Sequence, residues 1–116
     1  MMTGNNECVW EVRENEGVAV VALGGEMNMH RTPALQAMLA QVCQDQPARL
    51  VINLEQVSHM DSSGLGTLVE TLRRIRGYGG TLALCALPER VRGLFEITHL
   101  DRLFLIYPSE AEALAR

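Results

Sequence analysis

Short apolar runs alternate along this sequence with longer segments in which apolar residues recur at helical spacing, and this alternation restricts the fold more than any other feature. Apolar runs of about four to eight residues between turn residues are typical of buried strands, whereas a stripe at i, i+3, i+4 and i+7 indicates an amphipathic helix. Strands that are separated by helices pair in parallel through right-handed crossovers. The pattern therefore predicts an α/β fold built on one sheet.

The expected elements follow the order ββαβαβαβα. The first two strands, 8–15 and 18–25, are joined by the turn sequence ENEG and pair antiparallel, so the sheet is mixed. The first helix is capped by Thr32 and has Pro33 in its first position. The remaining elements are a strand at 50–54, a helix at about 63–76, a strand at 81–86, a helix opened by Pro88, a strand at 103–107 and a helix that starts at the capping box of Ser109 and Glu112.

The first two helices each carry an apolar stripe that predicts the core. We expect both helices to pack on the same face of the sheet. The stripes consist of Leu35, Met38, Leu39 and Val42 in the first helix, and of Leu65, Leu68, Val69, Leu72 and Ile75 in the second.

Length and composition exclude several classes of protein. The 116 residues suggest one domain, 1–116, with an ordered part at about 8–115 and flexible residues 1–7. A net charge of −4 and an aromatic content of 4% give no support to nucleic-acid binding, which needs a basic face and stacking side chains. No apolar run approaches the ~20 residues that span a membrane, and the polar N-terminus lacks the apolar segment of a signal peptide.

The cysteines indicate the compartment and argue against a metal. Cys8, Cys43 and Cys85 are odd in number and widely spaced, without a Cys-x-x-Cys pair or a Cys/His cluster. We therefore expect a protein of the reducing cytoplasm, with neither a metal nor a cofactor.

The segment HMDSSGLGT, residues 59–67, lies where a central strand turns into a helix. Ligands and modifications in α/β sheets gather at such strand ends. The first N–H groups of a helix lack intrahelical partners and carry partial positive charge, so that a phosphate is favoured there.

This segment has two interpretations. Asp and Ser are preferred helix caps and Gly suits tight turns, so it is explained by a capped turn alone. A modification site is favoured by other features: Gly64 and Gly66 each cost roughly 1 kcal/mol inside a helix, and two hydroxyls at an exposed helix start are accessible to another protein. The residues alone leave Ser62 and Ser63 open as targets.

A catalytic serine is disfavoured. The esterase elbow reads G-x-S-x-G, and MDSSG lacks the glycine two residues before either serine. No phosphate-binding loop of the form G-x-x-x-x-G-K-[ST] is present, and His59 precedes the turn. We therefore expect no catalytic residue and no enzyme activity.

The same turn, taken with its flanks, resembles the STAS domain, specifically a bacterial anti-sigma-factor antagonist. The similarity rests on LVINLEQVSHMDSSGLGTL, on the GG before the next strand, on the helix VRGLFEITHL, and on the upstream GGEMNMHRTPALQAML. It extends over about residues 8–115.

The resemblance implies a sheet of four to five strands with about four helices packed on one side. Members of the family bind an anti-sigma factor that is also a serine kinase, and thereby free a sigma factor. The kinase phosphorylates the serine directly after the Asp, here Ser62, the complex dissociates, and a serine phosphatase resets the cycle. The implied switch surface, with no role in nucleic-acid binding or membrane insertion, is Asn28, Asp61, Ser62, Ser63 and Gly64.

Two residues depart from the family pattern. Asn28 stands where an Asp is common, and we expect it close to Ser62 at the start of the second helix. If the missing acid helps to orient the serine, phosphorylation is slower here and Asn28→Asp accelerates it. His99 stands where Gly is common, and because a non-Gly residue tolerates positive φ poorly, we expect the local turn to differ.

A second function stays open at this point. A STAS domain that is not phosphorylated also serves as a scaffold subunit of a lipid or anion transporter. Met27 and Met29, just before the first helix, either pack within their loop or line a surface that adapts to a partner.

Overall fold

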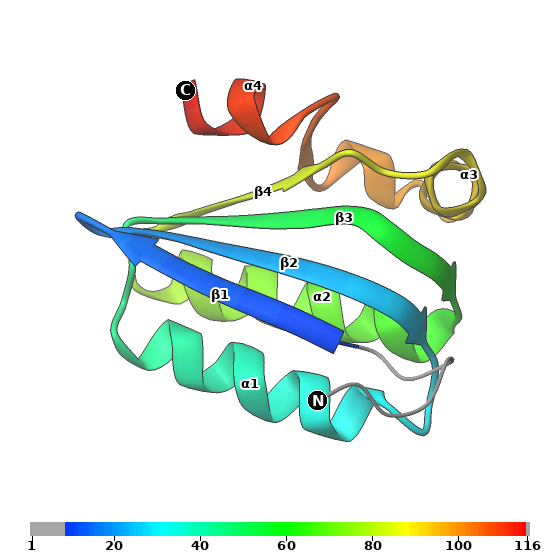
Figure 1. Cartoon of the computed structure of the whole chain (residues 1–116), viewed down its shortest axis with the longest axis horizontal. Coiled ribbons are helices and arrows are strands. Elements are labelled where there is room, and N and C mark those ends of the chain that lie inside the picture. The colour runs from blue at the N-terminus through cyan, green and yellow to red at the C-terminus, as the bar shows by residue number, and fades with distance from the viewer. Residues whose placement is uncertain (1–8, 116) are drawn as a thin grey trace.

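The computed structural model describes residues 9–115 and contains one five-stranded sheet, ordered β1-β2-β3-β4-β5 (Figure 1). β1 pairs antiparallel with β2, and the other neighbouring pairs are parallel. The expected mixed sheet and the order ββαβαβαβα are therefore confirmed, whereas the expectations for residues 1–7 and Cys8 lie outside the described residues. The elements are β1 (Val9–Asn15), β2 (Val18–Met27), α1 (Thr32–Gln44), β3 (Arg49–Met60), α2 (Ser62–Gly77), β4 (Thr81–Cys85), α3 (Glu89–Ile97), the 3-10 turn η1 (Leu100–Arg102), β5 (Leu105–Tyr107) and α4 (Glu110–Ala115).

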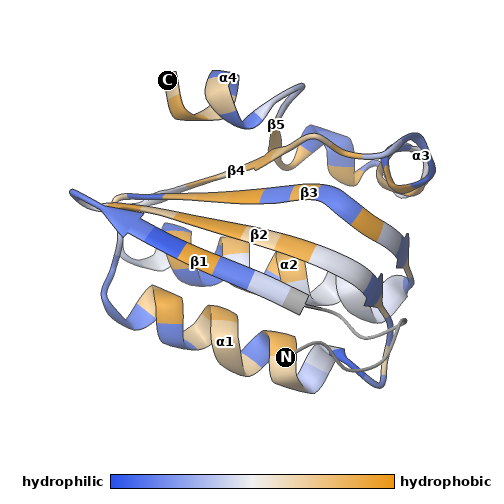
Figure 2. Cartoon of the chain, in the orientation of Figure 1, coloured by the Kyte–Doolittle hydropathy of each residue, from blue (hydrophilic) through white to orange (hydrophobic). Residues whose placement is uncertain are grey.

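α1 and α2 lie together on one face of the sheet, as expected, and the main core fills the space between them and the strands (Figure 1). Their stripes are buried except for Met38 and Val69, which are partly exposed. β2 is hydrophobic through its middle stretch and β3 through its first half, while β1 alternates (Figure 2). Core residues that are fully or almost fully buried include Val21, Leu35, Leu39, Leu50, Ile52, Leu68, Ile75 and Phe95.

The opposite face of the sheet is covered by α4 (Figure 1). A second, smaller cluster there consists of Val20, Val51, Ala83, Cys85 and Ala113, the last of which belongs to α4. The implied packing of all helices on one side is therefore wrong. The nearly unbroken apolar run of β2 gives the reason, since its alternate residues are apolar on both faces and both faces need cover.

Polar contacts attach α4 to the sheet. The Glu110 carboxylate accepts hydrogen bonds from Asn53 Nδ2 at 2.9 Å and from the Arg13 guanidinium at 2.6 Å. The Arg49 guanidinium donates to the carbonyl oxygen of Ala113 near the end of α4. These contacts hold a six-residue helix that is too short to be stable by itself.

β3 is much longer than the expected strand at 50–54. β2 continues to Met27, and the pairing of the two strands ends only where Met27 lies opposite Met60. β4, in contrast, pairs with β3 only as far as Asn53. The second half of β3 therefore has a neighbour on one side alone, and its exposed polar residues resemble a turn in the sequence.

The starts of two helices differ in how well they were predicted. Arg31, not Thr32, is the N-cap residue of α1, and it makes no side-chain capping bond. The turn before α1 is organised instead by Asn28, whose backbone carbonyl accepts from the N–H groups of Arg31 and Thr32. At α4 the Ser109 part of the expected capping box is confirmed, since Ser109 Oγ accepts from the Glu112 N–H at 3.2 Å.

Left-handed backbone occurs at the two turns for which the sequence provides an expectation. Glu16 and Gly17, with φ of 52° and 81°, form the two-residue hairpin turn that the ENEG sequence predicts. His99 follows α3 with φ of 63° and ψ of 16°, the conformation that glycine commonly supplies after a helix. The turn is therefore retained with a histidine in it, and the expectation that it differs is wrong.

Leu68 offers a test of the main core. Its side chain is fully buried between α2 and the sheet, so Leu68→Ala is expected to lower the free energy of unfolding by roughly 2–5 kcal/mol. Urea denaturation followed by circular dichroism measures the change. Arg73→Ala, on the exposed side of the same helix, is the control and is expected to shift stability by less than about 0.5 kcal/mol. A loss for Leu68→Ala as small as that of the control would contradict this packing.

Candidate functional site

Asp61 is the N-cap residue of α2. Its Oδ1 accepts hydrogen bonds from the N–H groups of Ser63 at 2.9 Å and Gly64 at 3.2 Å, and from the Ser63 hydroxyl at 2.5 Å. One carboxylate oxygen thus satisfies N–H groups that have no partner inside the helix. The capping function expected of this segment therefore belongs to the acid rather than to a serine.

The two serines differ in their surroundings. Ser63 is partly buried and its hydroxyl is bound to Asp61. Ser62 is the first residue of α2 and is exposed, and its hydroxyl has no hydrogen-bond partner among residues 9–115. The cap therefore engages one hydroxyl and leaves the other available at the surface.

Asp61 also ties the loop between β2 and α1 to this turn. Its backbone N–H donates to the carbonyl oxygen of Met27 at 3.1 Å, and its Oδ2 accepts from the N–H of Met29 at 3.2 Å. Met27 is fully buried, whereas 66% of Met29 is exposed. Neither methionine packs within the loop: Met27 ends β2 and is buried in the main core, whereas Met29 is exposed at the surface of the loop.

Asn28 lies between these two contacts. Its Oδ1 accepts from the N–H groups of His30 at 3.0 Å and Arg31 at 3.2 Å, and its Nδ2 donates to Glu26 Oε1 at 3.1 Å. The backbone therefore brings Asn28 into the loop that contacts Asp61, while its side chain is engaged by Glu26 and by its own turn. A contribution of Asn28 to phosphorylation stays a prediction.

Gly64 and Gly66 are present for different reasons. A Cβ on Gly64 would lie 2.8 Å from Met60 Cγ and 3.1 Å from the carbonyl oxygen of Met27, so only glycine allows α2 to begin this close to the strand ends. A Cβ on the exposed Gly66 would meet no atom of a neighbouring element within 4 Å in residues 9–115. Packing thus explains Gly64 but not Gly66.

The charge at this turn is fixed by the cap. The hydrogen bond from the Ser63 hydroxyl, supported by the N–H groups of Gly64, Ser63 and Met29, lowers the pKa of Asp61. The carboxylate is therefore ionised at neutral pH. The first turn of α2 contains no acidic residue, so within α2 and its cap the negative charge at the positive end of the helix dipole comes from Asp61.

The geometry gives no support to catalysis. Within residues 9–115, no hydrogen bond joins either serine to a histidine, although a nucleophilic serine needs an adjacent base. Burial raises the pKa of Cys85 to about 11, so its thiol stays protonated at neutral pH. The described residues contain no group of three or more His, Cys, Asp or Glu side chains arranged to hold a metal ion. Between residues 9 and 115 there is also no helix with the length and apolar character needed to cross a bilayer.

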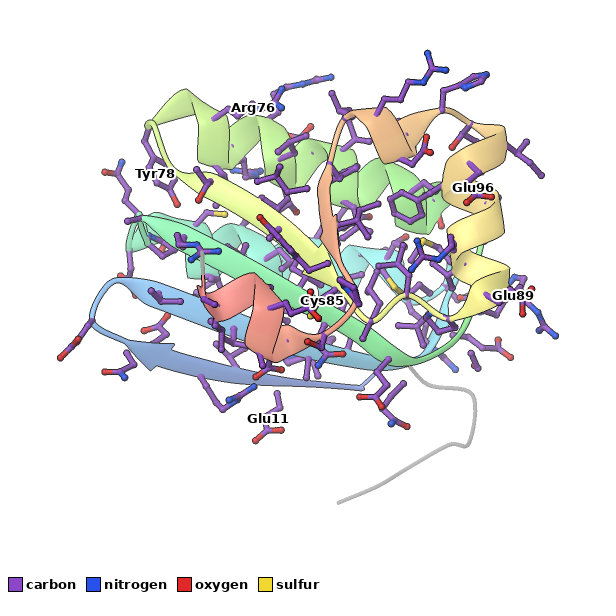
Figure 3. The ribbon with its side chains drawn as sticks, turned by 90° about the horizontal axis from the view of Figure 1, so that it is seen from above. Glu11, Arg76, Tyr78, Cys85, Glu89 and Glu96 are labelled. Carbon is purple, nitrogen blue, oxygen red and sulfur yellow. The ribbon has the colours of Figure 1, made fainter. Side chains whose placement is uncertain are left out.

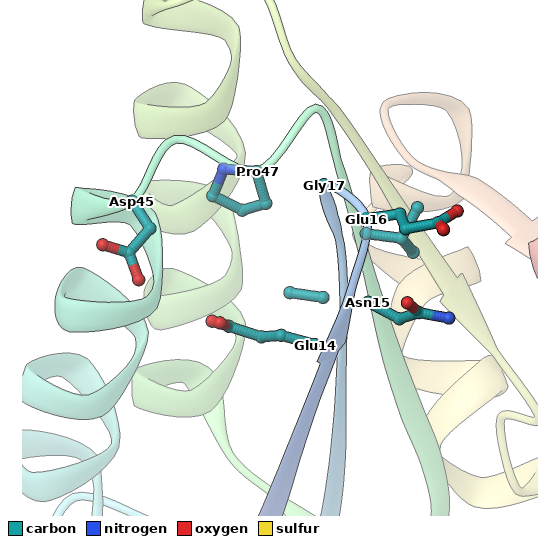
Figure 4. A pocket seen from close by; sticks show the side chains of 8 residues that line it. Glu14, Asn15, Glu16, Gly17, Asp45 and Pro47 are labelled. Atoms are coloured by element: carbon teal, nitrogen blue, oxygen red, sulfur yellow. The ribbon is translucent and has the colours of Figure 1, made fainter.

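A groove lies close to this turn, and a separate pocket lies far from it. A polar groove of about 490 Å³ runs between α1 and α2, and Gln36, Ser63, Gly66 and Glu70 are among its lining residues. A pocket of about 370 Å³ lies at the amino end of β2, where Glu14 extends toward the loop that carries Asp45 and Pro47 (Figure 4). The second pocket is at the opposite end of the sheet from Ser62 and does not belong to this site.

The sequence and the fold both match a known family. Residues 9–113 match the profile of the STAS domain. The chain belongs to the STAS domain family. Over 90 residues this STAS domain is 40% identical to the anti-sigma-B factor antagonist of Bacillus subtilis (strain 168), a match that covers 78% of this chain and 82% of that relative.

Solved structures share the STAS architecture. An anti-sigma factor antagonist from Mycobacterium paratuberculosis is 31% identical and superposes with a TM-score of 0.88, covering 98% of this chain and 97% of that chain. The Bacillus cell fate determinant SpoIIAA in its phosphorylated form superposes with a TM-score of 0.74 at 23% identity, covering 93% and 98% of the two chains. This second likeness shows the fold alone.

Sequence reasoning missed how far Asp61 reaches. Its contact with the Met29 N–H joins residues 32 positions apart, and local spacing carries no signal for such a contact. The preference of Asp for N-cap positions predicts that Asp61 binds the first N–H groups of α2. It does not predict the contact with the loop before α1.

The two glycines of this STAS domain provide a matched pair of variants. Gly64→Ala is expected to destabilise the fold by roughly 1–3 kcal/mol, because the new methyl group overlaps Met60 and Met27. Gly66→Ala is expected to stabilise it by up to about 1 kcal/mol, because alanine is the better helix former and the space is open. Urea midpoints measured on both variants check the prediction. Equal effects of the two changes would show that α2 starts elsewhere.

The cap predicts a dependence of stability on pH. Because the folded protein lowers the pKa of Asp61 below its ordinary value of 3.8, the cap's ionic contribution is present above that pH and is lost as the pH falls through the lower, folded-state pKa. Asp61→Asn retains an accepting oxygen but no charge. Wild type is therefore expected to be the more stable protein at pH 5–7, and the difference to shrink as the pH falls below 3.8. Thermal melts of both proteins across this range measure it, and a constant difference would contradict the charge argument.

Proposed function

We propose that this protein is an anti-sigma-factor antagonist, which binds an anti-sigma factor that is also a serine kinase and so releases a sigma factor. Phosphorylation of Ser62 by that kinase ends the interaction, and a serine phosphatase restores it. The cycle takes place in the cytoplasm, and the protein acts as a binding partner rather than as an enzyme. The observation that carries the proposal is the exposed, unbonded hydroxyl of Ser62 beside the Asp61 cap.

The relatives support the same function. The Bacillus subtilis protein, at 40% identity, is named an anti-sigma-B factor antagonist, and the structure from Mycobacterium paratuberculosis is named an anti-sigma factor antagonist. Each of these matches covers more than two thirds of the relative's own chain. The likeness therefore extends over most of the length of each relative.

The position of Ser62 suits a switch of binding rather than of folding. A phosphate adds roughly −1.5 to −2 charge and three acceptor oxygens. Within the free protein, the positive end of α2 offsets part of the repulsion from the Asp61 carboxylate. In a complex, the phosphate and Asp61 would both be desolvated against the partner. A penalty of ~3 kcal/mol there weakens binding more than a hundredfold.

The proposed partner surface extends from Ser62 to its neighbours. Met29 is an exposed, flexible apolar side chain whose backbone is held by Asp61, and such side chains adapt to a partner. Gly66, for which packing gives no reason, leaves α2 without a side chain one turn after Ser62. We propose that a partner backbone approaches closely there, so Gly66→Ala would weaken the complex while stabilising the free protein.

The function is tested with the anti-sigma factor kinase of the same organism and ATP. We expect mass spectrometry to locate a single phosphate on Ser62 and none on Ser63, whose hydroxyl is bound to Asp61. Ser62→Ala is expected to bind the kinase as tightly as wild type and to resist release by ATP. Ser62→Asp is expected to weaken binding, but less than phosphate does because it carries one charge.

Ser63→Ala is the matched control for this experiment. It removes the neighbouring hydroxyl and leaves Ser62 in place, so phosphorylation is expected to continue. Phosphate on Ser63 alone would show that the other hydroxyl is the target. Failure to bind the kinase, with stable capture of a membrane transporter complex instead, would support the scaffold function.

An Asn28→Asp variant tests the departure from the family pattern in the same assay. The new carboxylate would still accept from the His30 and Arg31 N–H groups but would face Glu26 in place of the present amide hydrogen bond. Faster phosphorylation would show that the missing acid takes part in the reaction. Unchanged phosphorylation would restrict Asn28 to shaping the loop.

A further inference from the structure

We infer that β1 is a self-association edge: it pairs antiparallel with β1 of a second copy of this chain, and the two five-stranded sheets join into one. This inference concerns the edge of the sheet and does not depend on the function proposed for Ser62.

The edge and the groove beside it expose apolar surface. Among the described strands only β2 pairs with β1, so the outer side of β1 is unpaired. Trp10 is 39% exposed and Val12 38% exposed. With Ala37 and Met38 of α1 they help to line a groove of about 540 Å³. A strand edge with apolar side chains along it is a template for pairing with another strand.

The hairpin turn determines which backbone groups point outward. Asn15 and Val18 flank a two-residue turn, and the residues flanking such a turn exchange both hydrogen bonds. Because bonded and non-bonded positions alternate along an antiparallel strand, Arg13 and Glu11 also direct their backbone groups toward β2. The N–H and carbonyl groups available for a second copy are those of Trp10, Val12 and Glu14.

Symmetry restricts the register. In an antiparallel pair, residues that lie opposite one another project from the same face of the sheet. When a two-fold axis relates the two copies, this condition holds only if one residue of β1 lies opposite the same residue of the second copy. Centred on Val12, the pairing sets Trp10 opposite Glu14 and Glu11 opposite Arg13. Registers centred on Glu11, Arg13 or Glu14 set like charges directly opposite one another, and within residues 9–115 a register centred on Trp10 sets no opposite charges against one another.

The charged residues are placed for the Val12 register. Glu11 projects from β1 at the edge of the sheet on the α4 side and is exposed (Figure 3). The Arg13 side chain is 51% exposed and already binds Glu110 at 2.6 Å. A guanidinium has five N–H donors, so Arg13 can bind Glu110 and the partner's Glu11 together. The symmetry forms this ion pair twice, once on each side of Val12.

The groove lies on the other face of β1, between this strand and α1. Trp10, Val12 and Glu14 point toward α1, on the side opposite to Arg13. Joining two copies at Val12 brings the two grooves together beneath the seam. The exposed Ala34 and Ala37 present little bulk there, so α1 of each copy can approach the other. The same surface thus offers backbone hydrogen bonds, apolar cover and complementary charge to a copy of itself.

Charge reversal tests the register directly by sedimentation-velocity ultracentrifugation across a range of concentrations. Glu11→Arg sets arginine opposite Arg13 twice, and Arg13→Glu sets glutamate opposite Glu11 twice, so each variant alone is expected to dimerise at least roughly tenfold more weakly than wild type. An equal mixture of the two variants is expected to restore the dimer, because every opposed pair in the mixed complex then has opposite charges. Glu96→Arg, the same charge change on exposed α3, is the control and leaves dimerisation unchanged.

Val12→Pro is a second and independent test. The Val12 N–H points to the free edge, so proline removes a bond to the second copy without removing one to β2. This variant is expected to be monomeric with a circular dichroism spectrum like that of wild type. A wild-type chain that stays monomeric up to millimolar concentration would overturn the inference. So would a mixture of the two charge variants that sediments like its separate components.

Discussion

The carboxylate of Asp61 holds together the parts of the molecule that matter most for its function. One oxygen caps α2 and binds the Ser63 hydroxyl, and the other binds the N–H of Met29 in the loop before α1. The end of β3, the start of α2 and the β2–α1 loop therefore meet at one side chain. Since Ser62 is the next residue, its position at the surface follows from the same set of contacts.

Much of the fold could be predicted from the sequence because each element carries a strong local signal. The stripes of α1 and α2 at helical spacing, the ENEG turn and the Ser109 cap each depend on neighbours in the chain. The wrong predictions concern features that depend on contacts between residues far apart in the sequence. The second half of β3 is polar because β4 does not reach it, and α4 packs on the far face because β2 is apolar on both sides. His99 adopts left-handed backbone that its own preference opposes.

The candidate site was predicted in part for the same reason. The position of Ser62 at a helix start and the capping role of an acid are local features, and the sequence indicated both. Which hydroxyl is engaged depends on the conformation of the Asp61 side chain. Its attachment to Met29 depends on β2 and β3 ending side by side. The exposure of Met29 beside a buried Met27 likewise follows from that contact and not from the sequence around them.

The two proposed surfaces have a joint consequence. A pair joined at β1 would carry two Ser62 turns on one rigid sheet, and a partner that is itself two-fold could engage both. Binding at the second turn would then be intramolecular, with an effective concentration set by the sheet rather than by a flexible linker. Phosphorylation of one Ser62 would therefore weaken such a complex less than phosphorylation of both.

Because α4 covers Cys85, chemical modification of this thiol can measure how often α4 separates from the sheet. Cys85 is fully buried beneath a six-residue helix that is held mainly by Glu110, Arg49 and the single buried side chain of Ala113 (Figure 3). Local unfolding of so small a unit requires far less free energy than unfolding of the main core. In a Cys8→Ser chain, the rate at which a thiol reagent modifies Cys85 therefore reports how often α4 leaves the sheet. Cys43, buried in the main core, reports global unfolding in the same reaction.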